Sequence, residues 1–243
     1  MSEPGALLAA RSVRKSFGAL TVLEGVDFEL GSQAAVGIVG PNGAGKTTLL
    51  NVLSGALRPN SGTVHFQSAD ITGLDAARRC RLGIARSHQV PRPFGGMTVF
   101  ENLVVAGANG GGFARADACE RAIESLRLCG MLRVANRRAE TLGLLDRKRL
   151  ELARALATDP LVLLLDEIGG GLTDGEAAQL VETIRTLRAR GIAIVWIEHI
   201  VHILVQVAER LICMDAGRVI ADGDPRAVLA DARVVDAYLG GRK

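Results

Sequence analysis

The chain has 243 residues, of which 48% are hydrophobic, with a net charge of +3 and a sequence pI of about 8.9. This length and apolar content suit a folded chain with a substantial core and exclude disordered and fibrous classes. The basic residues form no long run, so the charge does not favour nucleic-acid binding. The four cysteines show no CxxC pairing and no metal-like spacing with the four histidines, which predicts reduced thiols in a cytosolic chain.

The sequence contains no stretch apolar enough to cross a membrane. Its longest apolar runs, residues 161–165 and 192–197, are far shorter than the roughly 20 residues that a membrane helix needs. We also expect no signal peptide. If the protein serves a membrane, it is expected to do so from the cytoplasmic side.

The first thirty residues predict two antiparallel strands. Apolar and polar residues alternate over Leu7–Val13 and again over Val26–Leu30, with a turn at residues 16–19 between them. Phe17 lies in this turn and is one of only eight aromatic residues, six Phe, one Tyr and one Trp. Position alone leaves two interpretations with equal weight: the ring stacks on an adenine, or it packs the turn.

The next segment satisfies the phosphate-binding pattern G-x-x-x-x-G-K-[ST] at every fixed position. A buried strand is predicted before it, at residues 35–39, and a helix after it, at residues 46–56. Glycines allow the backbone to wrap around an anion with its N–H groups inward, at the positive end of the helix dipole. The pattern therefore predicts a P-loop, made of Gly40, Pro41, Asn42, Gly43, Ala44, Gly45, Lys46, Thr47 and Thr48.

Two side chains of this loop have specific expected roles. Lys46 is expected to reach the β- and γ-phosphates as a mobile point charge. The hydroxyl of Thr47 suits Mg²⁺, a hard cation that prefers oxygen ligands. A glycine-rich turn without a ligand is the less favoured alternative, because the strand and helix context matches.

Beyond the P-loop helix, the pattern alternates between short strands and helices. A turn is predicted at residues 57–62 and a strand at 63–66. After a loop, a further strand is predicted at 82–87, and Pro91 and Pro93 prevent it from continuing. Gln89 lies in the segment that leaves this strand. Helical spacing follows from Thr98, breaks at residues 109–112 and resumes at 116–128. Residues 95–157 are therefore expected to form a mostly helical insert.

A run of five apolar residues, 161–165, predicts a strand buried on both faces of a parallel sheet. It ends in Asp166 and Glu167, at the carboxyl edge where open α/β sheets place ligands. Asp166 is expected to hold Mg²⁺ through water, and Glu167 to orient or deprotonate an attacking water. Helix capping is a weak alternative for this pair, because Thr173 and Glu176 already supply a capping box.

A further strand at residues 192–197 leads to Glu198 and His199. Taken alone, such a histidine is more often structural than catalytic, but at this sheet edge His199 is positioned to donate a hydrogen bond to a γ-phosphate. A metal site made with His202 is not favoured. The remainder predicts a helix at 201–208, strands at 210–214 and 218–221, and two short helices ending near Tyr238.

Together these residues resemble the ATP-binding subunits of ABC transporters over nearly the whole chain. Gly40–Thr48 look like the Walker A segment, residues 161–166 like the Walker B strand, and Glu167 like the catalytic glutamate. Gln89 looks like the Q-loop residue, which implies that it joins Thr47 and Asp166 at Mg²⁺, and His199 like the switch histidine. The resemblance also implies ATP as the nucleotide and Phe17 as the residue that stacks on adenine.

The resemblance implies one ABC ATP-binding domain over residues 1–243. Its expected fold class is α/β: a P-loop NTPase core with a mostly parallel sheet, an antiparallel β subdomain and an inserted helical subdomain. The core is expected at residues 1–94 and 158–243 and the helical subdomain at 95–157, touching a membrane partner near Gln89.

Within the family, four runs look like the branched-chain amino acid importer group: residues 16–18, 70–74, 82–86 and 152–158. The resemblance then implies a head-to-tail dimer with a second ATP-binding subunit, integral membrane permease subunits, and, indirectly, a periplasmic or extracellular solute-binding protein. The chain would lie peripherally on the cytoplasmic face of the membrane. The alternative function is a soluble ABC-type ATPase that clamps or regulates a macromolecule.

Three departures from the family pattern stand out. The signature, usually Leu-Ser-Gly-Gly-Gln, is replaced here by a signature segment made of Leu142, Gly143, Leu144, Leu145 and Asp146. Ile168 stands where the family usually has a proline after the catalytic glutamate. Thr173 stands where the family often has an aspartate in the loop that follows. We expect Asp146 to be a helix N-cap. The basic residues 147–149 have two equally favoured interpretations: they bind a docked anion, or they form a solvated basic face. The altered signature segment predicts a heterodimer with unequal sites.

Overall fold

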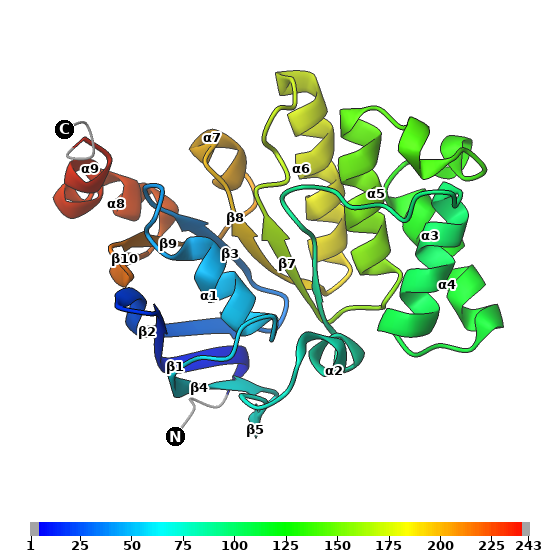
Figure 1. Ribbon diagram of the computed structural model, residues 1–243. Coiled ribbons are helices and arrows are strands. Elements are labelled where there is room, and N and C mark those ends of the chain that lie inside the picture. Colours follow the sequence, from blue (N-terminus) through cyan, green and yellow to red (C-terminus); the bar gives the residue numbers. More distant parts are fainter. Residues whose placement is uncertain (1–4, 240–243) are drawn as a thin grey trace.

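The computed structural model describes residues 5–239, so the ends of the expected domain, residues 1–4 and 240–243, lie outside the described residues. A six-stranded sheet crosses the middle of the molecule, with a smaller sheet on one side and helices on the other (Figure 1). The strands are β1 (Ala6–Phe17), β2 (Leu20–Gly31), β3 (Ala35–Val39), β4 (Ser61–Phe66), β5 (Ala69–Asp70), β6 (Ile84–Arg86), β7 (Val162–Asp166), β8 (Ala193–Ile197), β9 (Arg210–Asp215) and β10 (Arg218–Gly223). The α-helices are α1 (Lys46–Leu53), α2 (Ala76–Arg81), α3 (Val99–Val105), α4 (Arg115–Leu128), α5 (Leu144–Leu156), α6 (Asp174–Ala189), α7 (Val201–Leu204), α8 (Pro225–Ala230) and α9 (Ala232–Leu239).

The large sheet has the strand order β10-β9-β3-β8-β7-β6, and all its neighbours are parallel except β10, which is antiparallel to β9 at the edge. Strands β3, β7 and β8 are buried along their whole length. This burial explains their unbroken apolar sequences, because helices or the second sheet cover both faces. Since these strands are parallel, the segments that follow them meet at one edge, as expected.

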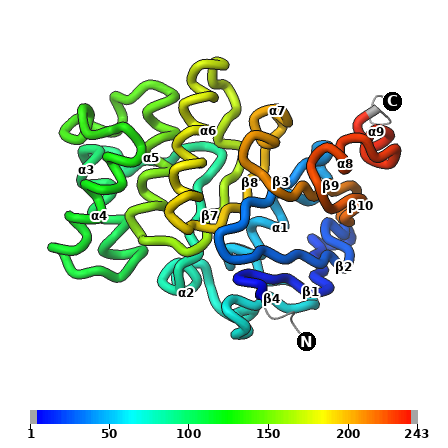
Figure 2. Tube along the Cα trace, turned by 180° about the vertical axis from the view of Figure 1, so that it is seen from behind, coloured from blue at the N-terminus to red at the C-terminus, as the bar shows by residue number. Residues whose placement is uncertain are grey.

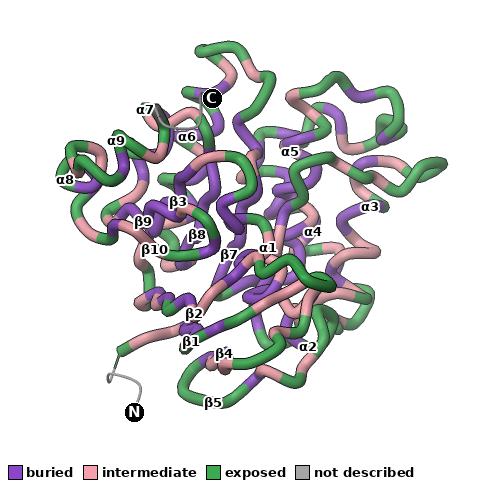
Figure 3. The backbone as a smooth tube through the Cα atoms, turned by 60° about the vertical axis from the view of Figure 1, so that its left-hand side comes forward, coloured by how far each residue is buried: buried purple, intermediate pink, exposed green. Residues whose placement is uncertain are grey.

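The small sheet is antiparallel, with the order β2-β1-β4-β5. The pairing of β1 with β2 confirms the predicted pair of antiparallel strands, joined by a turn at residues 18–19. A buried apolar cluster joins this sheet to one face of the large sheet and to helix α1. Figure 3 shows that burial is concentrated where these layers meet.

Between β6 and β7 the chain is helical, as predicted for the insert. Helices α3, α4 and α5 are accompanied by a π-helical turn at Ala106–Gly110 and by 3₁₀ turns at Leu132–Val134 and Ala139–Thr141. Thr98 and Glu101 form a reciprocal capping box that begins α3. These helices lie together at one end of the molecule, on the side of β7 away from β10, in both ribbon and trace (Figures 1 and 2).

Three element predictions need correction. Helix α1 ends at Leu53 instead of continuing to residue 56, α7 ends at Leu204 instead of 208, and the loop predicted after β4 contains α2. The first and third share a cause, because the buried guanidinium of Arg79 in α2 donates to the carbonyls of Val52 (2.7 Å) and Leu53 (2.9 Å). A tertiary contact thus satisfies the last carbonyl groups of α1, which no local pattern reveals.

Candidate functional site

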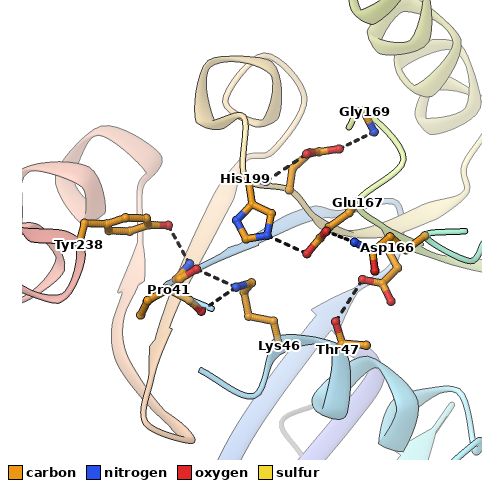
Figure 4. A network of polar contacts seen from close by, with 11 residues as sticks. Pro41, Lys46, Thr47, Asp166, Glu167, Gly169, His199 and Tyr238 are labelled. Atoms are coloured by element: carbon orange, nitrogen blue, oxygen red, sulfur yellow. Dashed lines mark hydrogen bonds and ion pairs between the residues drawn. The ribbon is translucent and has the colours of Figure 1, made fainter. Parts of the chain in front are cut away.

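The candidate site lies where the segments after β3, β7 and β8 converge (Figure 4). A cavity of about 190 Å³ opens there, lined by Val22, P-loop residues 42–48 and Glu167. The P-loop follows β3, Glu167 follows β7, and His199 follows β8. The structure therefore brings together the three groups that the sequence placed at one sheet edge.

The backbone of the P-loop has the conformation that its glycines permit. Gly43 and Gly45 have φ angles of 84° and 98°, in the left-handed region. A Cβ at Gly45 would lie 2.7 Å from the Val22 carbonyl oxygen, so a larger residue does not fit. Helix α1 begins directly after Gly45 with no side-chain cap and no acidic residue in its first turn. Its N-terminal N–H groups are therefore available to an anion, and the loop fits phosphate.

The Lys46 side chain is buried, 5% exposed, and its ammonium bonds to its own loop. Nζ donates to the carbonyl oxygens of Gly40 (2.7 Å) and Pro41 (2.9 Å). Burial lowers the pKa of Lys46, while the carboxylates of Glu167 and Asp166 act in the opposite direction. Both bonds are to neutral acceptors, so the ammonium gains when an anionic phosphate replaces them.

The side chains predicted for Mg²⁺ include a hydroxyl and a carboxylate in contact. Thr47 Oγ1 donates to Asp166 Oδ1 at 3.4 Å, and Asp166 is only 2% exposed. Asp166 Oδ2 accepts from Arg86 Nη2 at 2.7 Å, and Arg86 also donates to Asn51 on α1. The oxygen donors fit a hard divalent cation. Arg86 and Asn51 escaped prediction, although Arg86 ends a parallel strand at this same edge.

Glu167 lies at the centre of the site. Its backbone is in the left-handed region, with φ of 48°, a conformation that costs energy for a residue with a Cβ. This turn ends β7 and leads the carboxylate towards the P-loop. Glu167 Oε1 lies 2.8 Å from His199 Nε2, and Oε2 accepts from Gln89 Nε2. A carboxylate only accepts, so the contact requires the proton of His199 on Nε2.

The loop after Glu167 is held by two buried charged groups that sequence reasoning missed. Glu198 accepts from the Gly169 N–H (2.5 Å) and from the His199 N–H (3.0 Å), while burial raises its pKa. Lys148 Nζ, on α5, donates to the carbonyl oxygens of Ile168 (3.0 Å) and Gly170. The only sequence signal for Glu198 was its position after β8, and Lys148 stood out only as part of the basic run at residues 147–149, with no sign of its partners.

Phe17 is not part of the cavity. Its ring is 48% exposed at the end of β1, and Lys15 Nζ lies 5.2 Å from the ring centroid. The cavity wall on this side of the molecule is Val22, on the neighbouring strand β2. Adenine stacking by Phe17 therefore stays a prediction.

The signature segment also lies away from the cavity, and one prediction about it is wrong. Helix α5 begins at Leu144 with Gly143 as its N-cap, in extended conformation (φ −68°, ψ 172°). Asp146 is therefore in the first turn and caps no backbone group. Its carboxylate pairs instead with Arg133 (3.3 Å) and Arg149 (3.7 Å). Because Gly143 already has the extended backbone of an N-cap, the helix starts earlier than the acidic residue suggested.

The basic run at residues 147–149 makes hydrogen bonds within its own chain. Arg147 donates to the carbonyl oxygens of Leu142 (2.8 Å) and Glu140 (3.0 Å). Lys148 binds the loop after Glu167, and Arg149 contacts Gln179 on α6. The three cations therefore fasten the start of α5 to its own chain, and Lys148 is buried, so a fully solvated basic face does not form. Docking of an anion at this run stays a prediction.

Comparison of the sequence with models of known protein families agrees with the P-loop and the carboxylates found at this sheet edge. The sequence model of the family described as "ABC transporter" matches residues 23–169. The chain belongs to the ABC transporter family. A second model, described as "Branched-chain amino acid ATP-binding cassette transporter", matches residues 218–243.

Relatives and solved structures in the ABC transporter family align with the whole chain. The "High-affinity branched-chain amino acid transport ATP-binding protein LivG" of Salmonella typhimurium is 37% identical over 255 residues, covering 99% of each chain. The "Lipopolysaccharide export system ATP-binding protein LptB" of Acidithiobacillus ferridurans is 33% identical, covering 99% of this chain and 98% of its own. A crystal structure of an ATP-binding cassette of an ABC transporter in its ADP conformation matches with a TM-score of 0.87 at 32% identity, covering 97% and 99% of the two chains.

The chain is thus an ABC ATPase, with the α/β cassette fold that the sequence predicted. Within residues 5–239, the helices are all too short or too polar to span a bilayer.

Proposed function

We propose that this chain is the ATP-hydrolysing subunit of an ABC importer that takes up branched-chain amino acids or a similar small solute. One observation carries the catalytic part: Glu167, bonded to Gln89 and His199, lines the same cavity as the P-loop. The full-length similarity to an amino acid transport subunit and the match at residues 218–243 support the solute class.

The residues divide the work of binding and hydrolysis. The P-loop N–H groups and Lys46 hold the β- and γ-phosphates. Thr47, the amide oxygen of Gln89 and, through water, Asp166 would hold Mg²⁺, which would neutralise phosphate charge when bound. Glu167 then accepts the proton of the attacking water on its carboxylate. His199 donates its Nε2 proton to Glu167 in this structure, and we propose that it donates this proton to the γ-phosphate instead when the nucleotide is bound.

Each cassette is proposed to work in a head-to-tail dimer in which the signature segment covers the nucleotide of its partner. Gly143 lacks the hydroxyl of the signature serine, and Leu144, 51% exposed at the N-terminus of α5, stands where the signature carries a glycine. Asp146 adds an acidic group in the first turn of the helix. These side chains weaken contact with a γ-phosphate, so we propose a heterodimer with a similar subunit. The free N–H groups of α5 keep some affinity for the anion, because Asp146 caps none of them.

The remaining partners follow from the same proposal. Integral membrane permease subunits would dock on the helical subdomain, residues 95–157, near Gln89, and a solute-binding protein would deliver the solute to them. The α/β core would consist of residues 1–94 and 158–243. The chain would then lie peripherally on the cytoplasmic face of the membrane.

The test is Glu167→Gln in the assembled transporter, with Glu182→Gln as the matched control. Glu182 is exposed on α6, away from the cavity, and pairs with Arg185 on the same helix. Hydrolysis is expected to fall about 10²- to 10⁴-fold for the first and to stay unchanged for the second, with ATP binding retained in both. Uptake of radiolabelled leucine into vesicles is expected to fall in parallel. Near-normal turnover of Glu167→Gln would exclude the role of Glu167. An active ATPase that co-purifies with no membrane subunit would favour the clamp function instead.

A further inference from the structure

The C-terminal helix α9 makes a direct polar contact with the P-loop. The hydroxyl of Tyr238 accepts a hydrogen bond of 2.8 Å from the backbone N–H of Gly40, a residue 198 positions earlier in the chain. Figure 4 shows Tyr238 approaching the start of the loop from the side opposite Thr47 and Asp166. The catalytic scheme above makes no use of this contact.

Gly40 is fixed by its other neighbours as well. A Cβ at this position would lie 2.0 Å from the carbonyl oxygen of Met214 on β9, so the loop entrance is pressed against that strand. The carbonyl oxygen of Gly40 accepts from Lys46 Nζ at 2.7 Å. Gly40 therefore connects Tyr238, through its N–H, with the lysine that is expected to hold the phosphates.

The same C-terminal part of the chain supports the loop at a second point. In the turn between β9 and β10, the N–H of Gly217 donates to the carbonyl oxygen of Ala44 at 3.1 Å. The Gly217 carbonyl oxygen in turn accepts from the N–H of Glu24 on β2 at 2.9 Å. Residues 214–238 thus touch both the start and the middle of the P-loop.

The contact of Tyr238 is made by its hydroxyl more than by its ring. The side chain is 41% exposed, whereas Val234, one turn earlier, is buried and anchors α9 in the core. Burial of the hydroxyl region raises the pKa of Tyr238, so the group stays neutral around pH 7. Removing the oxygen alone therefore breaks the bond to Gly40 with little loss of packing.

We propose that Tyr238 is a positioning residue for nucleotide binding, which sets the affinity of the P-loop by fixing Gly40. This inference rests on one part of the proposed function, the binding of ATP by the P-loop. Without an acceptor, the Gly40 amide and the loop entrance are less ordered, and the nucleotide must order them again on binding. Tyr238 lies within residues 218–243, the segment that matches the sequence model of branched-chain amino acid cassettes. The proposed role would explain what this segment does for the P-loop.

The experiment compares Tyr238→Phe with Val235→Ala, an exposed position on the same helix. Calorimetric titration is expected to show ATP and ADP binding weakened about five- to tenfold by Tyr238→Phe, as expected for one hydrogen bond, and unchanged by Val235→Ala. Hydrogen exchange of the nucleotide-free proteins is expected to be faster at the Gly40 amide in Tyr238→Phe alone. At saturating ATP, kcat is expected to stay within about twofold, which places the effect in binding.

Each other outcome contradicts the inference in a distinct way. ATP affinity equal to wild type in Tyr238→Phe would overturn the positioning role and leave the proposed function intact. A fall in the nucleotide-free unfolding temperature of more than about 5 °C would show a structural role instead. Wild-type protein that binds no ATP would overturn both the inference and the proposed function.

Discussion

Replacing Lys148 by methionine tests whether helix α5 controls the loop that follows the catalytic glutamate. The Lys148 side chain is 6% exposed, and its ammonium donates to the carbonyl oxygens of Ile168 and Gly170. Methionine preserves the length and most of the volume of the side chain but removes both bonds. It also removes a cation whose charge favours the ionised form of Glu198.

The expected cost follows from these contacts. Hydrogen bonds from a charged donor contribute about 1.5–3 kcal/mol each, so two of them amount to roughly 3–6 kcal/mol. Burial lowers the pKa of Lys148, which shows that desolvation of the ammonium offsets part of this gain. We therefore expect the free energy of unfolding to fall by about 2–4 kcal/mol. For a chain of this size, the unfolding temperature is expected to fall by about 4–15 °C.

The assay is urea unfolding of the nucleotide-free chain, with Arg147→Met as the matched control. Arg147 also donates to two carbonyl oxygens, but its side chain is exposed, so its loss is expected to cost less than about 1 kcal/mol. Because the loop begins next to Glu167, kcat is expected to fall in Lys148→Met while ATP affinity is retained. Equal stabilities of the two variants would refute the assigned role of Lys148.

Three further predictions follow from the site and the core. Lys46→Ala is expected to abolish tight ATP binding in a nucleotide titration, since it removes the cation held at the P-loop, and unchanged affinity would contradict the P-loop assignment. In the intact transporter, changing Glu167 to Gln is expected to reduce turnover more than the same change in the partner subunit, and equal losses would argue against unequal sites. Burial raises the pKa of Cys129 to about 12 and of Cys213 to about 11, so iodoacetamide at pH 8 is expected to leave both unmodified in the native protein, as peptide mass spectrometry can check.

Much of the fold was predictable because its determinants are local. The unbroken apolar runs at β3, β7 and β8 indicated strands buried on both faces, and the structure confirms them. Parallel strands bring their carboxyl ends to one edge, so the sequence also indicated that the P-loop, Glu167 and His199 would meet. The helix capping box of Thr173 and Glu176 was equally readable, because its partners are three residues apart.

The sequence by itself therefore determined the chemistry of the site, through the residues at the ends of buried strands and the glycines of the P-loop. Only the tertiary structure decided what holds that chemistry in place: Arg86 on Asp166, Lys148 on the loop after Glu167, and Tyr238 on Gly40. These contacts join residues 20 to 198 positions apart, and a side chain that bonds to a distant carbonyl or N–H leaves no periodic or spacing signal. Periodicity records which face of an element is buried, whereas a polar partner is fixed only when the elements pack.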